Sequence, residues 1–225
     1  MRALVFDAGP VISLTMNNLL WLLPELQKRF QGKFIIPAAV EYELVGKPLQ
    51  TKRFELEGFQ VIECINNRTL EVSHEVAQEK TQHLLDIANS CFQAGGRDLR
   101  IVQFAEMEAL LLAKMTGADA AVIDERTTRL LIEDPKKLHH ILEHKLHQKV
   151  ALQKDRLRDF HRHVGSVRII RSVELGYAAY RLGLLDRYIS SPDQKRQLLD
   201  AVLWGIKLDG CAVSKKEVAE ILRMG

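Results

Sequence analysis

The 225-residue chain has 32 Lys and Arg against 29 Asp and Glu, a formal net charge of +3, and 47% of its residues are hydrophobic. This composition excludes an intrinsically disordered chain, which needs low hydrophobicity and high net charge. No apolar run reaches the ~18–20 residues of a membrane span. Asp7, Gly9 and Pro10 interrupt the apolar N-terminal stretch, so we expect a cytoplasmic protein without a signal peptide.

Short apolar runs alternate with helical patterns along the chain. Strands are predicted at residues 2–6, 34–36, 59–62, 120–123 and 167–170. Helices are predicted over residues 12–26, 37–44, 70–90, 104–117, most of 127–163 and the segments that begin at Ser191-Pro192 and Ser214. Gly117 predicts a helix end, and Ser214 with Glu217 predicts a capping box. This alternation predicts an α/β fold with a central parallel sheet covered by helices on both faces.

Acidic residues lie at the edges of these apolar segments: Asp7, Glu43, Glu106, Asp124 and Glu125. In an open parallel sheet the functional crevice lies at the carboxyl ends of the strands, where these side chains could converge. Converging carboxylates favour a hard cation such as Mg²⁺ or Mn²⁺, and a pair of such ions can activate water for phosphodiester hydrolysis. The alternative is structural: acids near a helix N-terminus also stabilise the helix dipole.

Four segments in order resemble the motifs of PIN-domain nucleases, particularly archaeal-type members. They are Val5-Phe6-Asp7-Ala8-Gly9-Pro10, Ile36-Pro37-Ala38-Ala39-Val40-Glu41-Tyr42-Glu43-Leu44, Ala105-Glu106-Met107-Glu108-Ala109-Leu110 and Ala118-Asp119-Ala120-Ala121-Val122-Ile123-Asp124-Glu125-Arg126. The resemblance covers residues 1–130 and, more loosely, 167–225. It implies a PIN-like three-layer domain spanning residues 1–225.

The resemblance also implies a function. Asp7, Glu43, Glu106 and Asp124 would hold Mg²⁺ or Mn²⁺, with Glu125 as another candidate for the last catalytic position. The expected activity is that of a metal-dependent endoribonuclease, which hydrolyses RNA with a metal-activated water. Many relatives are toxins of toxin–antitoxin pairs, so an antitoxin-like protein is an expected partner.

Two departures from the family pattern support a second hypothesis. Ala8 follows the first aspartate, where many members have Ser or Thr, and the sequence Ile123-Asp124-Glu125 leaves the register of the fourth acid open. The alternative function is therefore a catalytically weak or inactive PIN-fold module that binds RNA or protein.

Residues 136–163 concentrate positive charge. Eight Lys and Arg and three Asp and Glu give this segment +5 and leave −2 for the rest, and six of the eight histidines lie here. We expect residues 133–165 to form a basic, histidine-rich helical insertion. His140, Glu143 and His144 match the H-x-x-E-H pattern of some zinc metalloproteases, but no third ligand is evident.

The insertion has several interpretations. Its apolar stripe could pack on the core, on a second copy in a homodimer, or on an antitoxin-like partner. Its cations could contact RNA phosphates, with Lys145, Lys149 and Arg156 as candidates. Arg126 and Arg129 are candidates for positioning phosphate near the metal, and the alternative for them is the start of a surface helix.

Overall fold

The first strand, β1 (Ala3–Phe6), is formed by four consecutive buried residues and lies at the centre of the main sheet. The computed structural model describes residues 2–225, in which this sheet has the order β3-β2-β1-β6-β8 with all neighbours parallel. Its other strands are β2 (Lys33–Pro37), β3 (Glu71–Ser73), β6 (Ala120–Val122) and β8 (Ile169–Ile170). The predicted central parallel sheet is confirmed.

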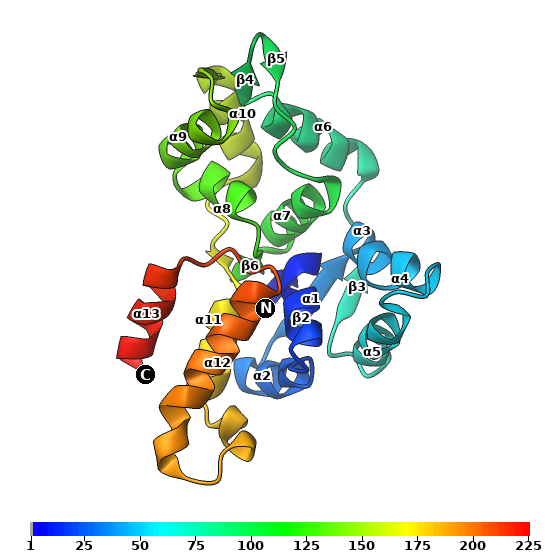
Figure 1. Cartoon of the computed structure of the whole chain (residues 1–225). Helices are drawn as coiled ribbons and strands as arrows, with labels where there is room; N and C mark the ends of the chain where they lie inside the picture. Colours follow the sequence, from blue (N-terminus) through cyan, green and yellow to red (C-terminus); the bar gives the residue numbers. More distant parts are fainter. Residues whose placement is uncertain (1) are drawn as a thin grey trace.

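Helices cover both faces of this sheet (Figure 1). Leu4 and Phe6 of β1 belong to one core, and Ala3 and Val5 to another, because successive strand residues face opposite sides. The first core includes residues of α1 (Ala8–Met16), α2 (Leu22–Phe30), α11 (Ser172–Arg181), α12 (Lys195–Leu208) and α13 (Lys215–Met224). The second includes residues of α6 (Gln78–Asn89) and α7 (Phe104–Thr116). The predicted three layers are therefore present.

Several predicted boundaries change. The strand predicted at residues 59–62 is wrong, because these residues lie in α5 (Glu55–Asn66), where Gly58, Val61 and Cys64 are buried at helical spacing. The helix predicted over 70–90 begins only at Gln78, after β3. The helix predicted over 12–26 is divided between α1 and α2.

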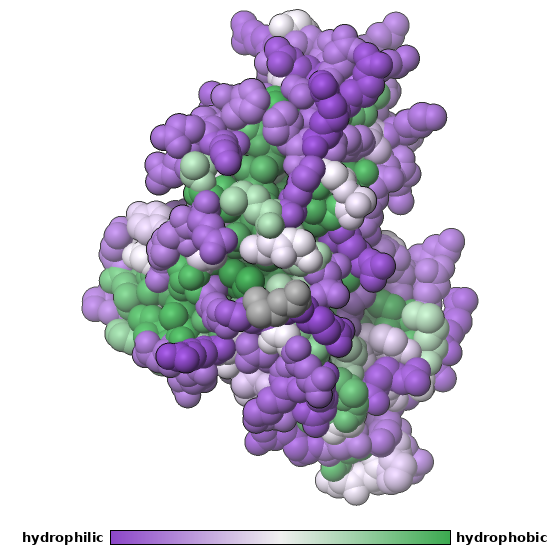
Figure 2. All heavy atoms as spheres, turned by 180° about the vertical axis from the view of Figure 1, so that it is seen from behind, coloured by the Kyte–Doolittle hydropathy of each residue, from purple (hydrophilic) through white to green (hydrophobic). Residues whose placement is uncertain are grey.

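A short series of helices joins β2 to α5. It comprises α3 (Ala38–Glu41), a π-helix (Tyr42–Gly46) and α4 (Lys47–Leu49). π-Helical turns are rare and often mark functional positions. Seen from behind, apolar side chains gather along the left edge of the molecule, on the side of α4 and α5 (Figure 2). Leu56 and Phe59 of α5 are large apolar side chains that are exposed to solvent.

A second, antiparallel sheet has the order β5-β4-β7 within the described residues and lies at the top of Figure 1. It pairs β4 (Phe92–Ala94) with β5 (Arg97–Asp98) and with β7 (Val150–Leu152). After α8 (Arg126–Glu133), the predicted insertion contains α9 (Pro135–Leu146), β7 and α10 (Lys154–Val164). The segment is largely helical, as expected. The strand β7 was not predicted, and it forms by pairing with the distant strand β4.

The predicted helix-capping signals are present in the structure. Gly117 has a left-handed conformation after α7, and Ser214 and Glu217 form the capping box of α13. Two 3₁₀ turns, Leu184–Tyr188 and Pro192–Gln194, precede α12. No helix among residues 2–225 is long and apolar enough to cross a membrane.

Candidate functional site

Asp7 lies at the carboxyl end of the central strand, where β1 passes into α1. Its carboxylate caps α1 by accepting a hydrogen bond from the Gly9 N–H at 3.4 Å, and the residue is only 6% exposed. Burial raises the pKa of Asp7 to about 6. Repulsion from Glu43 and Asp124 adds to this shift, and the N–H groups of Ala8 and Gly9 oppose it. Among residues 2–225, no Lys or Arg side chain is one of the main groups that shift this pKa.

Glu106 lies in the first turn of α7 and is also buried. The hydroxyl of Thr128 in α8 donates a hydrogen bond to its carboxylate. Burial is the main reason that the pKa of Glu106 rises to about 8, and repulsion from Asp7 and Glu125 contributes. Asp7 therefore lies close enough to Glu106 to disfavour the ionised form of this glutamate.

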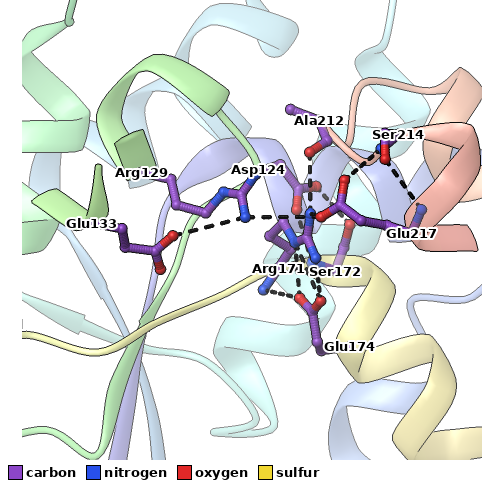
Figure 3. A network of polar contacts seen from close by, with 9 residues as sticks. All are labelled: Asp124, Arg129, Glu133, Arg171, Ser172, Glu174, Ala212, Ser214 and Glu217. Atoms are coloured by element: carbon purple, nitrogen blue, oxygen red, sulfur yellow. Dashed lines mark hydrogen bonds and ion pairs between the residues drawn. The ribbon is translucent and has the colours of Figure 1, made fainter. Parts of the chain in front are cut away.

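Asp124 follows the neighbouring strand β6 and is 3% exposed. Its Oδ1 accepts the Ser172 N–H at 2.8 Å, and its Oδ2 accepts the Ser172 hydroxyl at 2.6 Å (Figure 3). The Ser13 hydroxyl also donates to Oδ2, at 3.0 Å. A Cβ atom added at Gly9 would lie 3.5 Å from Asp124 Cβ and 3.6 Å from Asp7 Oδ2. The two aspartates therefore flank Gly9, as expected for residues that follow adjacent parallel strands.

Glu43 and Glu125 stand at the margin of this group and have partners of their own. Glu43 lies on the π-helix, 3.3 Å from the Lys47 ammonium, and Glu125 caps α8 by accepting the Thr127 N–H at 3.1 Å. Glu43 also borders an apolar pocket of about 310 Å³. The pocket is lined by Ile12, Thr15, Met16, Glu43, Leu44, Pro48, Phe54, Glu57, Val61 and Asp209.

The five cations predicted to contact nucleic acid lie in two regions. Arg126 is exposed at the start of α8, whereas the Arg129 side chain is 18% exposed and lies 3.8 Å from Glu133 and 4.0 Å from Glu217. Lys145, Lys149 and Arg156 are exposed in the segment 133–165. This upper part of the molecule has a mostly hydrophilic outer surface (Figure 2). Their contact with RNA remains a prediction.

The H-x-x-E-H motif has a structural use in this fold. Glu143 accepts the Val150 N–H at 3.2 Å, and His139 Nε2 lies 2.5 Å from the Val150 carbonyl oxygen. These contacts tie α9 to the start of β7. The glutamate of the motif thus takes part in the packing of the second sheet.

The candidate acids do not by themselves make a complete metal cage. Among residues 2–225, no group of three or more His, Cys, Asp or Glu side chains has an arrangement that could hold a metal ion. Asp7 and Glu106 nevertheless fit a hard cation, since both are buried and the charge of Asp7 raises the pKa of Glu106 through repulsion. Mg²⁺ is commonly bound by one or two carboxylates, with waters and substrate phosphates as its other ligands.

Sequence reasoning missed the neutral partners of these acids. Ser13 is 111 residues from Asp124, Ser172 is 48 residues from it, and Thr128 is 22 residues from Glu106. Such pairs become visible only when the strands and helices are assembled. In the sequence these residues show only a hydroxyl side chain. That feature does not distinguish them from the other serines and threonines of the chain.

A comparison with protein families finds a match to the PIN domain over residues 3–134, which is more than half of the chain. The matched region contains all five candidate acids and ends as α8 passes into α9. No curated protein and no solved structure matches the chain.

Proposed function

Because the chain belongs to the PIN-domain family, whose members are generally nucleases that use divalent metals, we propose that it is a metal-dependent endoribonuclease. The observation that carries this proposal is that Asp7 and Glu106 are both buried and that the charge of Asp7 raises the pKa of Glu106. Burying unpaired carboxylates costs free energy, and a site that keeps them usually offsets this cost by binding a cation.

In this proposal Asp7 and Glu106 are the main metal ligands, with Asp124 and Glu43 beside them. When bound, Mg²⁺ or Mn²⁺ supplies a Lewis acid that stabilises charge on phosphate and lowers the pKa of water. The carboxylate of Asp124 is oriented by Ser13 and Ser172, which hold it in one direction. This orientation leaves less conformational freedom to be lost when substrate binds.

Arg126 is the cation best placed to position the substrate. It is exposed and follows Glu125, which caps the same helix. A guanidinium group can bind a phosphate through two parallel hydrogen bonds. We expect Arg126 to bind the RNA backbone next to the acidic group, whereas Arg129 is shared between two glutamates of the chain.

The test is cleavage of a panel of single-stranded and structured RNAs with Mn²⁺, with Mg²⁺ and with EDTA. We expect cleavage only with metal, and a loss of at least about 100-fold in rate for Asp7→Asn and Glu106→Gln, in the range found when an electrostatic catalytic group is removed. Glu79→Gln is a matched control, because Glu79 also lies in the first turn of a helix but is exposed on α6. Cleavage that survives in Asp7→Asn would contradict the assignment.

A non-catalytic RNA- or protein-binding module is the second candidate. Two observations favour it. Both carboxylate oxygens of Asp124 already accept hydrogen bonds from serines, and Glu43 already has Lys47 as an ion-pair partner. Isothermal titration with Mn²⁺ separates the two functions. Heat of binding that disappears in Glu106→Gln supports the nuclease, and its absence in the wild type supports the binding module.

A further inference from the structure

Arg171 is a buried cation at the end of β8, and it connects three separate parts of the chain. The residue is 7% exposed and directly follows the strand. Its Nε lies 3.1 and 3.2 Å from the two carboxylate oxygens of Glu174, and its Nη1 donates to Glu217 at 2.8 Å and to the Ala212 carbonyl at 3.2 Å (Figure 3). A buried guanidinium with all these partners fixes the backbone around it.

The residues next to this cation are those that hold Asp124. Ser172 directly follows Arg171 and donates two hydrogen bonds to the Asp124 carboxylate, at 2.8 and 2.6 Å. Ala212, whose carbonyl accepts from Arg171, donates its own N–H to the Asp124 carbonyl oxygen at 3.1 Å. Both the backbone and the side chain of Asp124 are therefore bound by residues that Arg171 anchors.

Glu217 extends the network to the last helix. It accepts the Ser214 N–H at 2.8 Å as part of the capping box of α13, and it also accepts the hydrogen bond from Arg171. Its pKa falls to about 2. Burial opposes this shift, whereas hydrogen bonds from Ser214 and the charge of Arg171 favour the ionised form. The start of α13 is thus held at the edge of the main sheet, close to the acidic group.

We propose that Arg171 is a positioning residue of the candidate active site, and that α13, through Glu217, is a required part of it. Arg171 fixes the backbone at Ser172 and Ala212. Ser172 sets the direction of the Asp124 carboxylate, and Ala212 holds the Asp124 backbone carbonyl. Arg171, Ser172, Ala212 and Glu217 all lie outside residues 3–134, the region that matches the family. The catalytic consequence rests on the proposed nuclease function, whereas the positioning itself does not.

The experiment compares Arg171→Lys and Glu217→Gln in the full chain. Lysine keeps the charge but cannot reproduce the planar fork that reaches Glu174, Glu217 and Ala212 together. Glu217 is less buried than Arg171, so Glu217→Gln should fold even if Arg171→Lys does not. It weakens the same link because it removes the negative charge that pairs with Arg171. Arg29→Lys is the matched control, because Arg29 pairs with Glu25 at 3.1 Å on the surface of α2.

The first readout is hydrogen exchange of the metal-free protein. We expect the amides of Ser172 and Ala212 to lose protection by about tenfold in Arg171→Lys and Glu217→Gln, but not in Arg29→Lys. The second readout is Mn²⁺ affinity and the kcat of RNA cleavage, which we expect to fall by about 10–100-fold, as is usual when the groups that orient a metal ligand are changed. The KM for RNA should stay unchanged, since neither residue is assigned to RNA binding.

The outcomes separate the two proposals. Unchanged protection of Ser172 and Ala212 in both folded variants overturns the positioning role. Lost protection with unchanged Mn²⁺ affinity and kcat also overturns it, because Asp124 would then need no orientation. A wild-type protein that neither binds Mn²⁺ nor cleaves RNA contradicts the proposed function instead, and the exchange data still decide whether Arg171 orients Asp124.

Discussion

The hydroxyl of Thr128 donates a hydrogen bond to the carboxylate of Glu106, and this contact joins α8 to α7 beside the candidate site. It lowers the pKa of Glu106, but burial outweighs it and the pKa still rises to about 8, compared with about 6 for Asp7. In the metal-free protein at neutral pH, Asp7 is therefore mostly ionised and Glu106 mostly protonated.

This difference predicts that metal affinity depends on pH. Carboxylate ligands must be deprotonated, so metal binding releases the proton of Glu106 when the pH is below about 8. We expect the Kd for Mn²⁺ to decrease as pH rises from 6 to 9, by up to about tenfold per pH unit below the pKa of Glu106. Titration calorimetry in two buffers of different ionisation enthalpy measures the protons released, and an affinity that stays constant over this range would contradict the role of Glu106.

Glu106→Gln should stabilise the metal-free protein at alkaline pH. Because the folded pKa of Glu106 is about 8 against an ordinary 4.5, the folded state holds more protons than the unfolded state between these values. Wild-type stability is therefore lost as pH rises through this window. The glutamine variant avoids that loss, and its advantage at pH 8.5 should be on the order of 4–5 kcal/mol, at ~1.4 kcal/mol per unit of pKa difference.

Urea unfolding in EDTA at pH 5 and pH 8.5 measures this advantage. Gln keeps an oxygen that can accept from Thr128, so the hydrogen bond between the two helices is retained. The exposed Glu79→Gln variant should show no comparable change between the two pH values. An equal effect of Glu106→Gln at both pH values would be incompatible with the raised pKa.

Gly9→Ala should separate stability from metal binding. Its new Cβ would make ordinary contacts, 3.5 Å from Asp124 Cβ and 3.6 Å from Asp7 Oδ2, so the fold should tolerate it. Replacing a helical glycine by alanine can stabilise a protein by up to ~1 kcal/mol. The methyl group would nevertheless occupy space between the two aspartates, and we expect weaker Mn²⁺ binding at unchanged or higher Tm.

Gly205→Ala is the contrasting variant. A Cβ at this position would lie 2.1 Å from Asn17 Oδ1, and Asn17 donates to Asp209 at 2.8 Å and to the Ser13 carbonyl at 2.7 Å. Displacing Asn17 should cost roughly 1–3 kcal/mol of stability. Thermal unfolding of both variants checks the contrast. Strong destabilisation by Gly9→Ala would show that the space beside the aspartates is tighter than this geometry indicates.

RNA binding by the segment 133–165 should depend on salt. We expect replacement of Lys145, Lys149 and Arg156 by Ala to weaken binding of single-stranded RNA and to reduce the slope of log K against log salt by about 2, at ~0.7 per phosphate contact. Fluorescence anisotropy at several salt concentrations measures the slope. Lys52, Lys195 and Lys216, which are ion-paired and lie outside this segment, are the control triple. A slope that does not change would show that these cations are only solvated.

The sequence was most informative where a short apolar run ends at an acid. The runs that form β1 and β6 end at Asp7 and Asp124, and the rule that parallel strands present their carboxyl ends together placed both aspartates at one edge. The positive charge of the segment 136–163 was equally easy to predict, because counting charged residues needs no knowledge of the fold. These features depend on residues that are adjacent in the chain.

The sequence was least informative where the structure depends on contacts between segments that are distant in the chain. Four residues around Val61 are too few to distinguish a strand from a helix, and only the burial of Gly58 and Cys64 on the same face shows the helical period. β7 has three residues and exists because β4 pairs with it. The link from Arg171 to Glu217 spans 46 residues and has no local signature.

The pairing of β4 with β7 has a practical consequence for anyone who trims this protein to its recognisable family region. β4 lies inside residues 3–134 and β7 lies outside them, so a chain cut after residue 134 would leave one side of β4 without its partner. The same cut would remove Phe160, which is fully buried in the core shared with Phe92. Unpaired strand edges beside exposed apolar surface promote association between chains. We expect such a fragment to aggregate, which makes point substitutions in the full chain the appropriate tool for studying this segment.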